Sequence, residues 1–216
     1  MAGQCRSIRG AHYAAALVGP IVITLMLAEW SVELGPNDPV LEIPWRSKDG
    51  SVRFLDLKRQ PELLLEIPEA CTYEELATFL DWANSPDSQI ETAKCDVWST
   101  REMDADDEVF GEAVKFSSYV DLFFASLARN SFPEYERFVQ TLARMLRQAP
   151  DLSSAAQFIV RRCLDDRGGQ KVSDGFYITV YLHGYGTDVQ EARQRWAIGL
   201  TLVQNAMKQY LRSAKV

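Results

Sequence analysis

The stretch that decides the fold is residues 175–211, GFYITVYLHGYGTDVQEARQRWAIGLTLVQNAMKQYL, in which a strand, a glycine-rich turn and a long helix follow one another. Apolar side chains occupy every second position at its start, namely Phe176, Ile178, Val180 and Leu182. The positions between and after them hold Tyr177, Thr179, Tyr181 and His183. A period of two, built from aromatic and β-branched residues, predicts a strand with one apolar face. Gly184, Tyr185 and Gly186 predict a tight turn that ends this strand.

The helix predicted after this turn carries its own start signal. Thr187 and Asp188 are N-cap residue types, and Gln190 and Glu191 stand three residues after them, as in a capping box. The apolar stripe repeats at steps of three and four and consists of Val189, Ala192, Trp196, Leu200, Val203, Met207 and Tyr210. Between positions 196 and 203 apolar residues occupy nearly every side of the helix. We therefore expect Ile198 and Leu202 to meet either a neighbouring helix, such as 135–146, or a second subunit.

The rest of the chain alternates between strand and helix patterns. Residues 30–34, 40–45 and 51–57 predict an antiparallel meander, because Asp49 and Gly50 are a hairpin signal. Pro61 predicts a short helix over 61–66, and a capping box of Thr72 and Glu75 predicts the start of the next helix. Its stripe is Leu76, Phe79, Leu80 and Ala83.

The second half repeats this pattern of paired strands and helices. Strands are predicted over 89–100, 114–124 and 156–164, and a helix over 133–148. Paired strands with helices between the pairs indicate an α+β fold of two layers, a mainly antiparallel sheet with helices packed on one face. In the strand 89–100, Ala93 is expected on the apolar side with Cys95 and Val97. Residues 29–216 are expected to form one domain.

The first 28 residues are interpreted as a leader. Arg6 and Arg9 precede an uncharged run over 13–28, whose 16 residues are fewer than the roughly 20 that a membrane-spanning helix needs. One interpretation is a mis-annotated start, with translation beginning at Met26 and a cytoplasmic protein as the result. Another is a secretory signal or membrane anchor, which would place the protein outside the cytoplasm. A genuine structural segment is the third.

Composition narrows the function mainly by exclusion. The net charge is −7 and no cluster of lysine and arginine breaks it, which disfavours non-specific nucleic-acid binding and recruitment to an anionic membrane surface. The four cysteines are widely spaced without a CxxC pair, so neither a zinc site nor a disulfide framework is expected. The acidic residues of 102–108 lack the glycine and carboxylate spacing of a calcium loop and are interpreted as a solvated connector. No metal or cofactor is expected.

The face of the predicted sheet that points away from the helices is the candidate functional surface. It gathers Lys94, Asp96, Trp98, Tyr119, Asp121, Tyr177, Tyr181 and His183, and Arg161 is expected to join them. Rings with few rotamers beside placed polar groups are typical of recognition sites. Three interpretations are open: a ligand site, an interface with a partner or a second copy, or cross-strand pairs that only stabilise a half-exposed sheet.

Two functions from different classes follow from this face. The first is a non-catalytic binding or interaction protein, expected to be a homodimer with a protein or small-molecule partner. No residue is then assigned a catalytic role. The alternative is a small-molecule enzyme, such as a hydrolase, that uses Asp96, Asp121, Tyr181 and His183. It requires these side chains to converge within about 4–6 Å, with an aspartate orienting the histidine ring.

Overall fold

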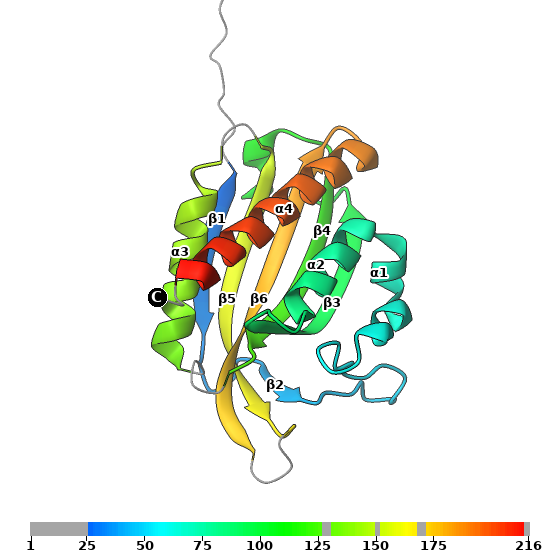
Figure 1. Ribbon diagram of the computed structural model, residues 1–216. Coiled ribbons are helices and arrows are strands. Elements are labelled where there is room, and N and C mark those ends of the chain that lie inside the picture. The colour runs from blue at the N-terminus through cyan, green and yellow to red at the C-terminus, as the bar shows by residue number, and fades with distance from the viewer. Residues whose placement is uncertain (1–25, 127–130, 150–151, 168–171, 214–216) are drawn as a thin grey trace, which may run out of the picture.

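The computed structural model describes residues 26–126, 131–149, 152–167 and 172–213 (Figure 1). One mainly antiparallel sheet of six strands carries helices on one face, which confirms the predicted α+β class. The strands are β1 (Leu27–Glu33), β2 (Val40–Ile43), β3 (Ile90–Thr100), β4 (Val114–Phe124), β5 (Ser154–Asp165) and β6 (Ser173–Gly186). The α-helices are α1 (Pro68–Thr72), α2 (Glu74–Asn84), α3 (Phe132–Leu146) and α4 (Val189–Ser213), and the 3₁₀-helices are η1 (Pro61–Glu66) and η2 (Asp107–Phe110).

The sheet runs β1-β5-β6-β4-β3, and β1 and β2 are parallel to β5 while the other pairs are antiparallel. β1 and β2 follow each other along the same edge of β5, where β1 pairs with residues 155–161 and β2 with 162–165. The predicted antiparallel meander over 30–57 is therefore wrong. Of its hairpin only one antiparallel bridge remains, between Arg46 and Arg53. Because the strands find their partner more than 100 residues away, turn signals between them could not reveal it.

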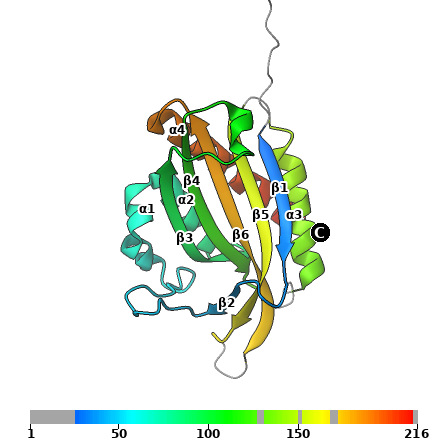
Figure 2. The same ribbon diagram turned by 180° about the vertical axis from the view of Figure 1, so that it is seen from behind.

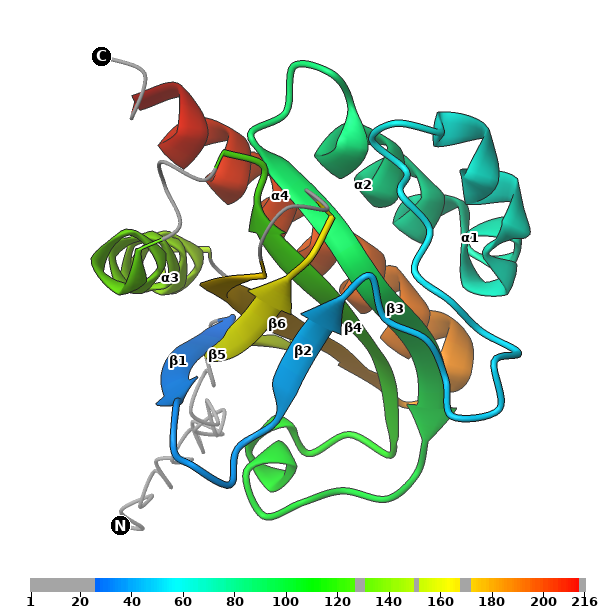
Figure 3. The same cartoon turned by 90° about the horizontal axis from the view of Figure 1, so that it is seen from below.

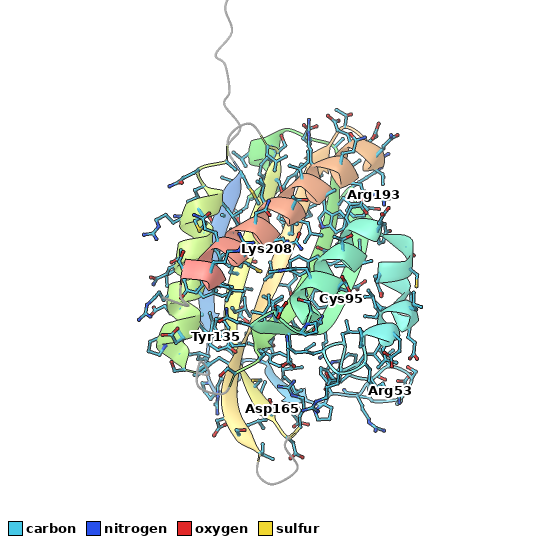
Figure 4. All side chains as sticks on the ribbon, in the orientation of Figure 1. Arg53, Cys95, Tyr135, Asp165, Arg193 and Lys208 are labelled. Atoms are coloured by element: carbon cyan, nitrogen blue, oxygen red, sulfur yellow. The ribbon has the colours of Figure 1, made fainter. Side chains whose placement is uncertain are left out.

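The predicted orientation of β6 is confirmed. Ile178, Val180 and Leu182 lie in the main hydrophobic core together with Trp196, which is fully buried. The indole nitrogen of Trp196 donates a hydrogen bond to Ser118 Oγ at 2.8 Å. Figure 3 shows α2, α3 and α4 on the same side of the sheet. An ion pair of 2.9 Å between Arg193 Nη2, labelled in Figure 4, and Glu75 Oε2 joins α4 to α2.

Gly184 and Gly186 do not form the predicted turn, because β6 continues through them to Gly186. A Cβ atom at Gly184 would lie 2.3 Å from both the carbonyl oxygen of Ala192 and the backbone nitrogen of Trp196. A Cβ at Gly186 would lie 2.5 Å from the nitrogen of Ala192. The two glycines thus allow the backbone of α4 to rest directly on the strand, which is a packing role and not a turn role.

The two predicted capping boxes have different outcomes. At α4, Asp188 Oδ1 accepts a hydrogen bond from the backbone nitrogen of Glu191 at 2.9 Å, and Glu191 Oε2 accepts one from that of Thr187 at 2.9 Å. At α2 the prediction is wrong, because Tyr73 occupies the N-cap without a side-chain bond. Thr72 instead closes α1 by donating from Oγ1 to the carbonyl oxygen of Pro68 at 2.8 Å.

The buried faces of α2 and α4 follow the predicted stripes except at Val189. The stripe of α2 is buried throughout: Leu76, Phe79, Leu80 and Ala83. In α4, Val189 is exposed at the first turn. Ile198, which is expected from the sequence to meet a neighbouring helix or a second subunit, is 53% exposed. Leu202 packs partly against the main core.

The fold includes the last residues of the predicted leader. β1 begins at Leu27, and Met26 and Ala28 are buried in the main core. Residues 1–25, on which the rest of the leader prediction falls, lie outside the described residues. Within the described ranges, no helix combines the length and the apolar character that crossing a bilayer requires.

Candidate functional site

The sheet face opposite the helices, called the polar sheet face below, is the one seen in Figure 2. The segment that contains η2 crosses one end of it, and β2 with the chain after it lies near the other end. Under β2 a second hydrophobic cluster forms, made of Leu41, Ile43, Phe123, Cys163 and Tyr177. The polar sheet face is therefore open only between these two covered ends.

Next to η2 this face is hollowed into a pocket of about 840 Å³, the η2 pocket. Trp98 of β3 and Tyr181, His183 and Tyr185 of β6 line it. The strand register explains the hollow: Trp98 lies opposite Ser117, Ser117 opposite His183, and His183 opposite Ala155. Because Ser117 and Ala155 are small, the larger rings around them leave space above the sheet.

A second pocket of about 590 Å³, the β3-edge pocket, lies at the other end. Lys94, Asp96 and Tyr119 line it together with Trp45 and the basic residues Arg46, Lys48 and Arg53. The Lys94 ammonium lies 4.8 Å from the centroid of the Trp45 ring. Ala93 also faces this end, against the prediction that it shares a side with Cys95, because the register of β3 shifts between Thr92 and Lys94.

The nine predicted site residues thus divide into three groups of three. Trp98, Tyr181 and His183 line the η2 pocket, and Lys94, Asp96 and Tyr119 line the β3-edge pocket. A row of rings connects the two pockets, with centroid distances of 6.5 Å for Trp98–Tyr119 and 5.9 Å for Tyr119–Tyr181. The remaining three, Asp121, Arg161 and Tyr177, line neither of these pockets.

Two of these three residues, Asp121 and Arg161, belong to a polar network, and the third, Tyr177, lies in the second hydrophobic cluster. Arg161 Nη1 donates to Thr179 Oγ1 at 2.7 Å, and Thr179 Oγ1 donates to Asp121 Oδ1 at 2.6 Å. Arg161 therefore lies on the polar sheet face, and its Nε also donates to Glu33 at 2.7 Å. Burial raises the pKa of Asp121 to about 6, although the bond from Thr179 acts to lower it. Tyr177 is 4% exposed and forms part of the second hydrophobic cluster.

His183 is held in place by Ser117, whose Oγ lies 2.8 Å from His183 Nδ1. Burial, aided by the charge of Lys115, lowers the pKa of His183 to about 4, so the ring is neutral at pH 7. Ser117 is fully buried and offers no exposed nucleophile. The sequence contains a signal for this pair, since alternation places both residues on the polar face, but the register that joins them is set by the fold.

The geometry required by the enzyme alternative is missing. Asp96 lies opposite Tyr119, and Tyr119 opposite Tyr181, so a whole strand separates Asp96 from Tyr181, or about 10 Å between outer strands. Asp121 lies opposite Thr179, four residues and about 13 Å along β6 from His183. The four side chains therefore do not converge on one reacting atom.

Nucleophilic chemistry at Cys95 or Cys163 is also disfavoured. Burial raises the pKa of both Cys95 and Cys163 to about 12, so neither carries a thiolate at neutral pH. Cys95, labelled in Figure 4, packs against the main core, and Cys163 lies in the second cluster on the other face.

The acidic segment beside the η2 pocket is more than the solvated connector that the sequence predicted. Asp107 is 7% exposed and pairs with the Lys115 ammonium. The Tyr185 hydroxyl donates to Asp107 Oδ1 at 2.6 Å, and the Phe110 ring stacks on that of Tyr185 at 4.0 Å. Burial opposes ionisation of Asp107, but the hydrogen bonds from Lys115 and Tyr185 prevail and lower its pKa. These contacts fix the segment that forms the pocket wall.

Among the residues that the structure describes, no group of three or more histidine, cysteine or acidic side chains is arranged to hold a metal ion. A scan against protein-family models, a search of curated proteins and a search of solved structures each found no match, so no relative assigns a family or an activity to this chain.

Proposed function

We propose that this chain is a non-catalytic binding protein that holds a small ligand in the η2 pocket. The observation that carries the proposal is the pocket itself, a hollow of about 840 Å³ lined by Trp98, Tyr181 and His183. This volume lies in the range of roughly 300–1,000 Å³ in which proteins hold small molecules. Aromatic walls with a few placed polar groups are the usual composition of such sites.

The floor of the pocket supports the proposal because it is organised before any ligand arrives. Trp98 and Tyr181 stand on strands of the sheet, and the bond to Ser117 fixes the ring of His183. In the described part of the chain the other ring nitrogen, His183 Nε2, has no hydrogen-bond partner, and His183 lines the pocket. A rigid floor reduces the entropy that binding costs, and Nε2 offers one polar contact to a ligand.

A fragment screen by protein-observed NMR tests the proposal. In a library of small aromatic compounds of positive, neutral and negative charge, we expect some to shift the indole signal of Trp98 and the amide signals of Tyr181 and His183 in a saturable way. Replacing Trp98 with alanine should weaken these fragments about fivefold or more, because a stacking ring contributes about 1 kcal/mol or more. Trp98 is only partly buried, so the melting temperature should change little.

Two further variants make this experiment decisive. Ala155→Leu should block the same fragments by filling the hollow without removing a ring or a charge, since Ala155 lines the η2 pocket and is not fully buried. Trp82→Ala, the same chemical change on α2, should leave fragment binding unchanged. A library without a single saturable hit at Trp98, Tyr181 or His183 would overturn the binding function, as would hits that survive both Trp98→Ala and Ala155→Leu.

Homodimerisation is part of the proposal and concerns a different surface. Its support is the side chain of Ile198, which is 53% exposed on the outer face of α4. We expect light scattering coupled to size exclusion to give twice the monomer mass, and Ile198→Glu to give the monomer mass. The variant Thr201→Glu, at an exposed polar position of the same helix, is the control for added charge. A monomeric wild type at high concentration would contradict the prediction. A cytoplasmic location likewise remains a prediction, for a chain that starts at Met26.

A further inference from the structure

The wall of the η2 pocket is strongly acidic. Five carboxylates line it, those of Glu29, Glu102, Asp104, Asp106 and Asp107. The Lys115 ammonium, the one lysine or arginine group lining it among the described residues, pairs with Asp107 and lies 3.7 Å from Asp104 Oδ2. In the described ranges, Glu29, Glu102 and Asp106 have no ion-pair partner. Three uncompensated negative charges therefore surround the opening.

The acidity is local to this pocket and does not simply follow from the net charge of the chain. The β3-edge pocket, which lies beside the edge strand β3, is lined by Arg46, Lys48, Arg53 and Lys94 against three acidic side chains. An overall charge of −7 would make both pockets acidic if charge were spread evenly. The β3-edge pocket is thus nearly balanced in charge, so the negative charge is concentrated at the η2 pocket and favours cationic ligands there.

The rings of the η2 pocket suit a cation as well. Trp98 and Tyr181 line it, and no lysine or arginine of the described residues lies over either ring. An ammonium or guanidinium group over the face of a tryptophan or tyrosine is attracted by the ring quadrupole. Carboxylates without an ion-pair partner and aromatic rings without a lysine or arginine over them are thus two independent features that attract the same kind of charge.

We infer that the ligand of the η2 pocket is a small organic cation with an aromatic or apolar body, such as an arylalkylamine. The inference rests on the proposed function and names its ligand class. The apolar body would pack on Trp98 and Tyr181, with the cationic group directed to the rim carboxylates of Glu29 and Asp106. An anionic ligand of the same shape would meet three uncompensated carboxylates and is excluded by repulsion.

Three probes of one shape and different charge test the inference: phenethylammonium, 2-phenylethanol and 3-phenylpropionate. Titrated into the full chain and followed at the Trp98 indole signal, phenethylammonium should bind at least tenfold more tightly than 3-phenylpropionate. Raising sodium chloride from about 0.05 to 0.5 M should remove most of this preference, because salt screens exposed charges. A lysine tripeptide, acetyl-Gly-Lys-Gly-amide, tests whether the pocket instead recognises the lysine side chain of a protein partner. It should bind more weakly than phenethylammonium.

Isosteric variants locate the charges responsible. The double variant Glu29→Gln/Asp106→Asn should weaken phenethylammonium about fivefold, since each exposed charge pair contributes a factor of about two to five. The control Glu42→Gln removes one exposed carboxylate that does not line the pocket and should change binding less than twofold.

The outcomes separate the ligand class from the binding function. Tighter binding of 2-phenylethanol or 3-phenylpropionate at Trp98 would overturn the inference and leave the binding function intact. A tripeptide that binds as tightly as phenethylammonium would overturn the small-molecule assignment and point to a basic protein partner. If the fragment screen finds ligands at this pocket but phenethylammonium is not among them, the inference is overturned. If no ligand of any kind binds at this pocket, both the ligand class and the binding function are ruled out.

Discussion

Replacing Gly184 with alanine should lower the free energy of unfolding by about 3 kcal/mol, at the upper end of the usual cost of overpacking a core. The added Cβ would lie 2.3 Å from the carbonyl oxygen of Ala192 and from the nitrogen of Trp196. Both are backbone atoms of α4, so no side-chain rotation relieves the contact, and the whole helix has to move off β6. Urea unfolding followed by circular dichroism measures the loss.

A matched control separates the clash from the general effect of replacing glycine. Gly35 lies in a surface turn, and a Cβ there would approach only the flexible Asp38 carboxylate, at 3.1 Å. Gly35→Ala should therefore cost less than about 1 kcal/mol. If Gly184→Ala were as stable as Gly35→Ala, α4 could not lie as close to β6 as the structure places it, and the two-layer packing would be wrong.

The same glycines show why the sequence predicted the two layers of the fold but not all of the contacts between them. Alternation in 176–183 fixed which side of β6 meets the helices, because a period of two is a local property of the chain. The meaning of Gly184 and Gly186 is not local. Glycine serves both a turn and a close backbone approach, and the second use becomes visible only when the position of α4 is known.

The candidate site shows the same limit. Alternation brought Trp98, Tyr181 and His183 to one face, and the structure places them around one pocket. The sequence did not predict that this face would be divided into two pockets. The η2 pocket exists because Asp107 fixes the acidic segment over one end of the sheet face. Lys115 and Tyr185, which pair with Asp107, come from the strands β4 and β6. A contact that joins Asp107 to residues 8 and 78 positions further along the chain leaves no periodic signal in any of the three segments.

Two buried groups, Asp121 and His183, should change the stability in opposite directions as pH falls. Burial raises the pKa of Asp121 from 3.8 to about 6, so the folded state binds its proton more tightly and stability increases as pH falls from above 6 toward 4. Burial lowers the pKa of His183 from 6.5 to about 4, so stability decreases as pH falls through the same window. Each shift corresponds to about 3 kcal/mol, and in the wild type the two nearly cancel.

Removing either group should make the effect of the other on the pH profile measurable. Asp121→Asn keeps an oxygen for the Thr179 hydroxyl, and the free energy of unfolding of this variant should fall by about 3 kcal/mol between pH 7 and pH 4. His183→Gln keeps a polar group beside Ser117, and its stability should rise by a similar amount over the same range. The control Asp81→Asn, at an exposed position of α2, should keep the flat profile of the wild type.

The carboxylates with lowered pKa values act mainly at the acid end of this range. The pKa values of Glu75, Asp107 and Asp165 are lowered from 4.5 for the glutamate and 3.8 for the aspartates, so the stability that these groups contribute is present above those values and is lost as pH falls through them. The pKa values of Asp49 and Glu191 are lowered as well. The change between pH 7 and about 5 is therefore set mainly by Asp121 and His183, and below that the difference between each variant and the Asp81→Asn control removes the contribution of the other carboxylates. Profiles of Asp121→Asn and His183→Gln that both remain flat would show that neither group is buried as the structure has it. In that case His183 would not be a buried, neutral side chain of the η2 pocket. Asp121 would be exposed to solvent instead of buried beside Thr179.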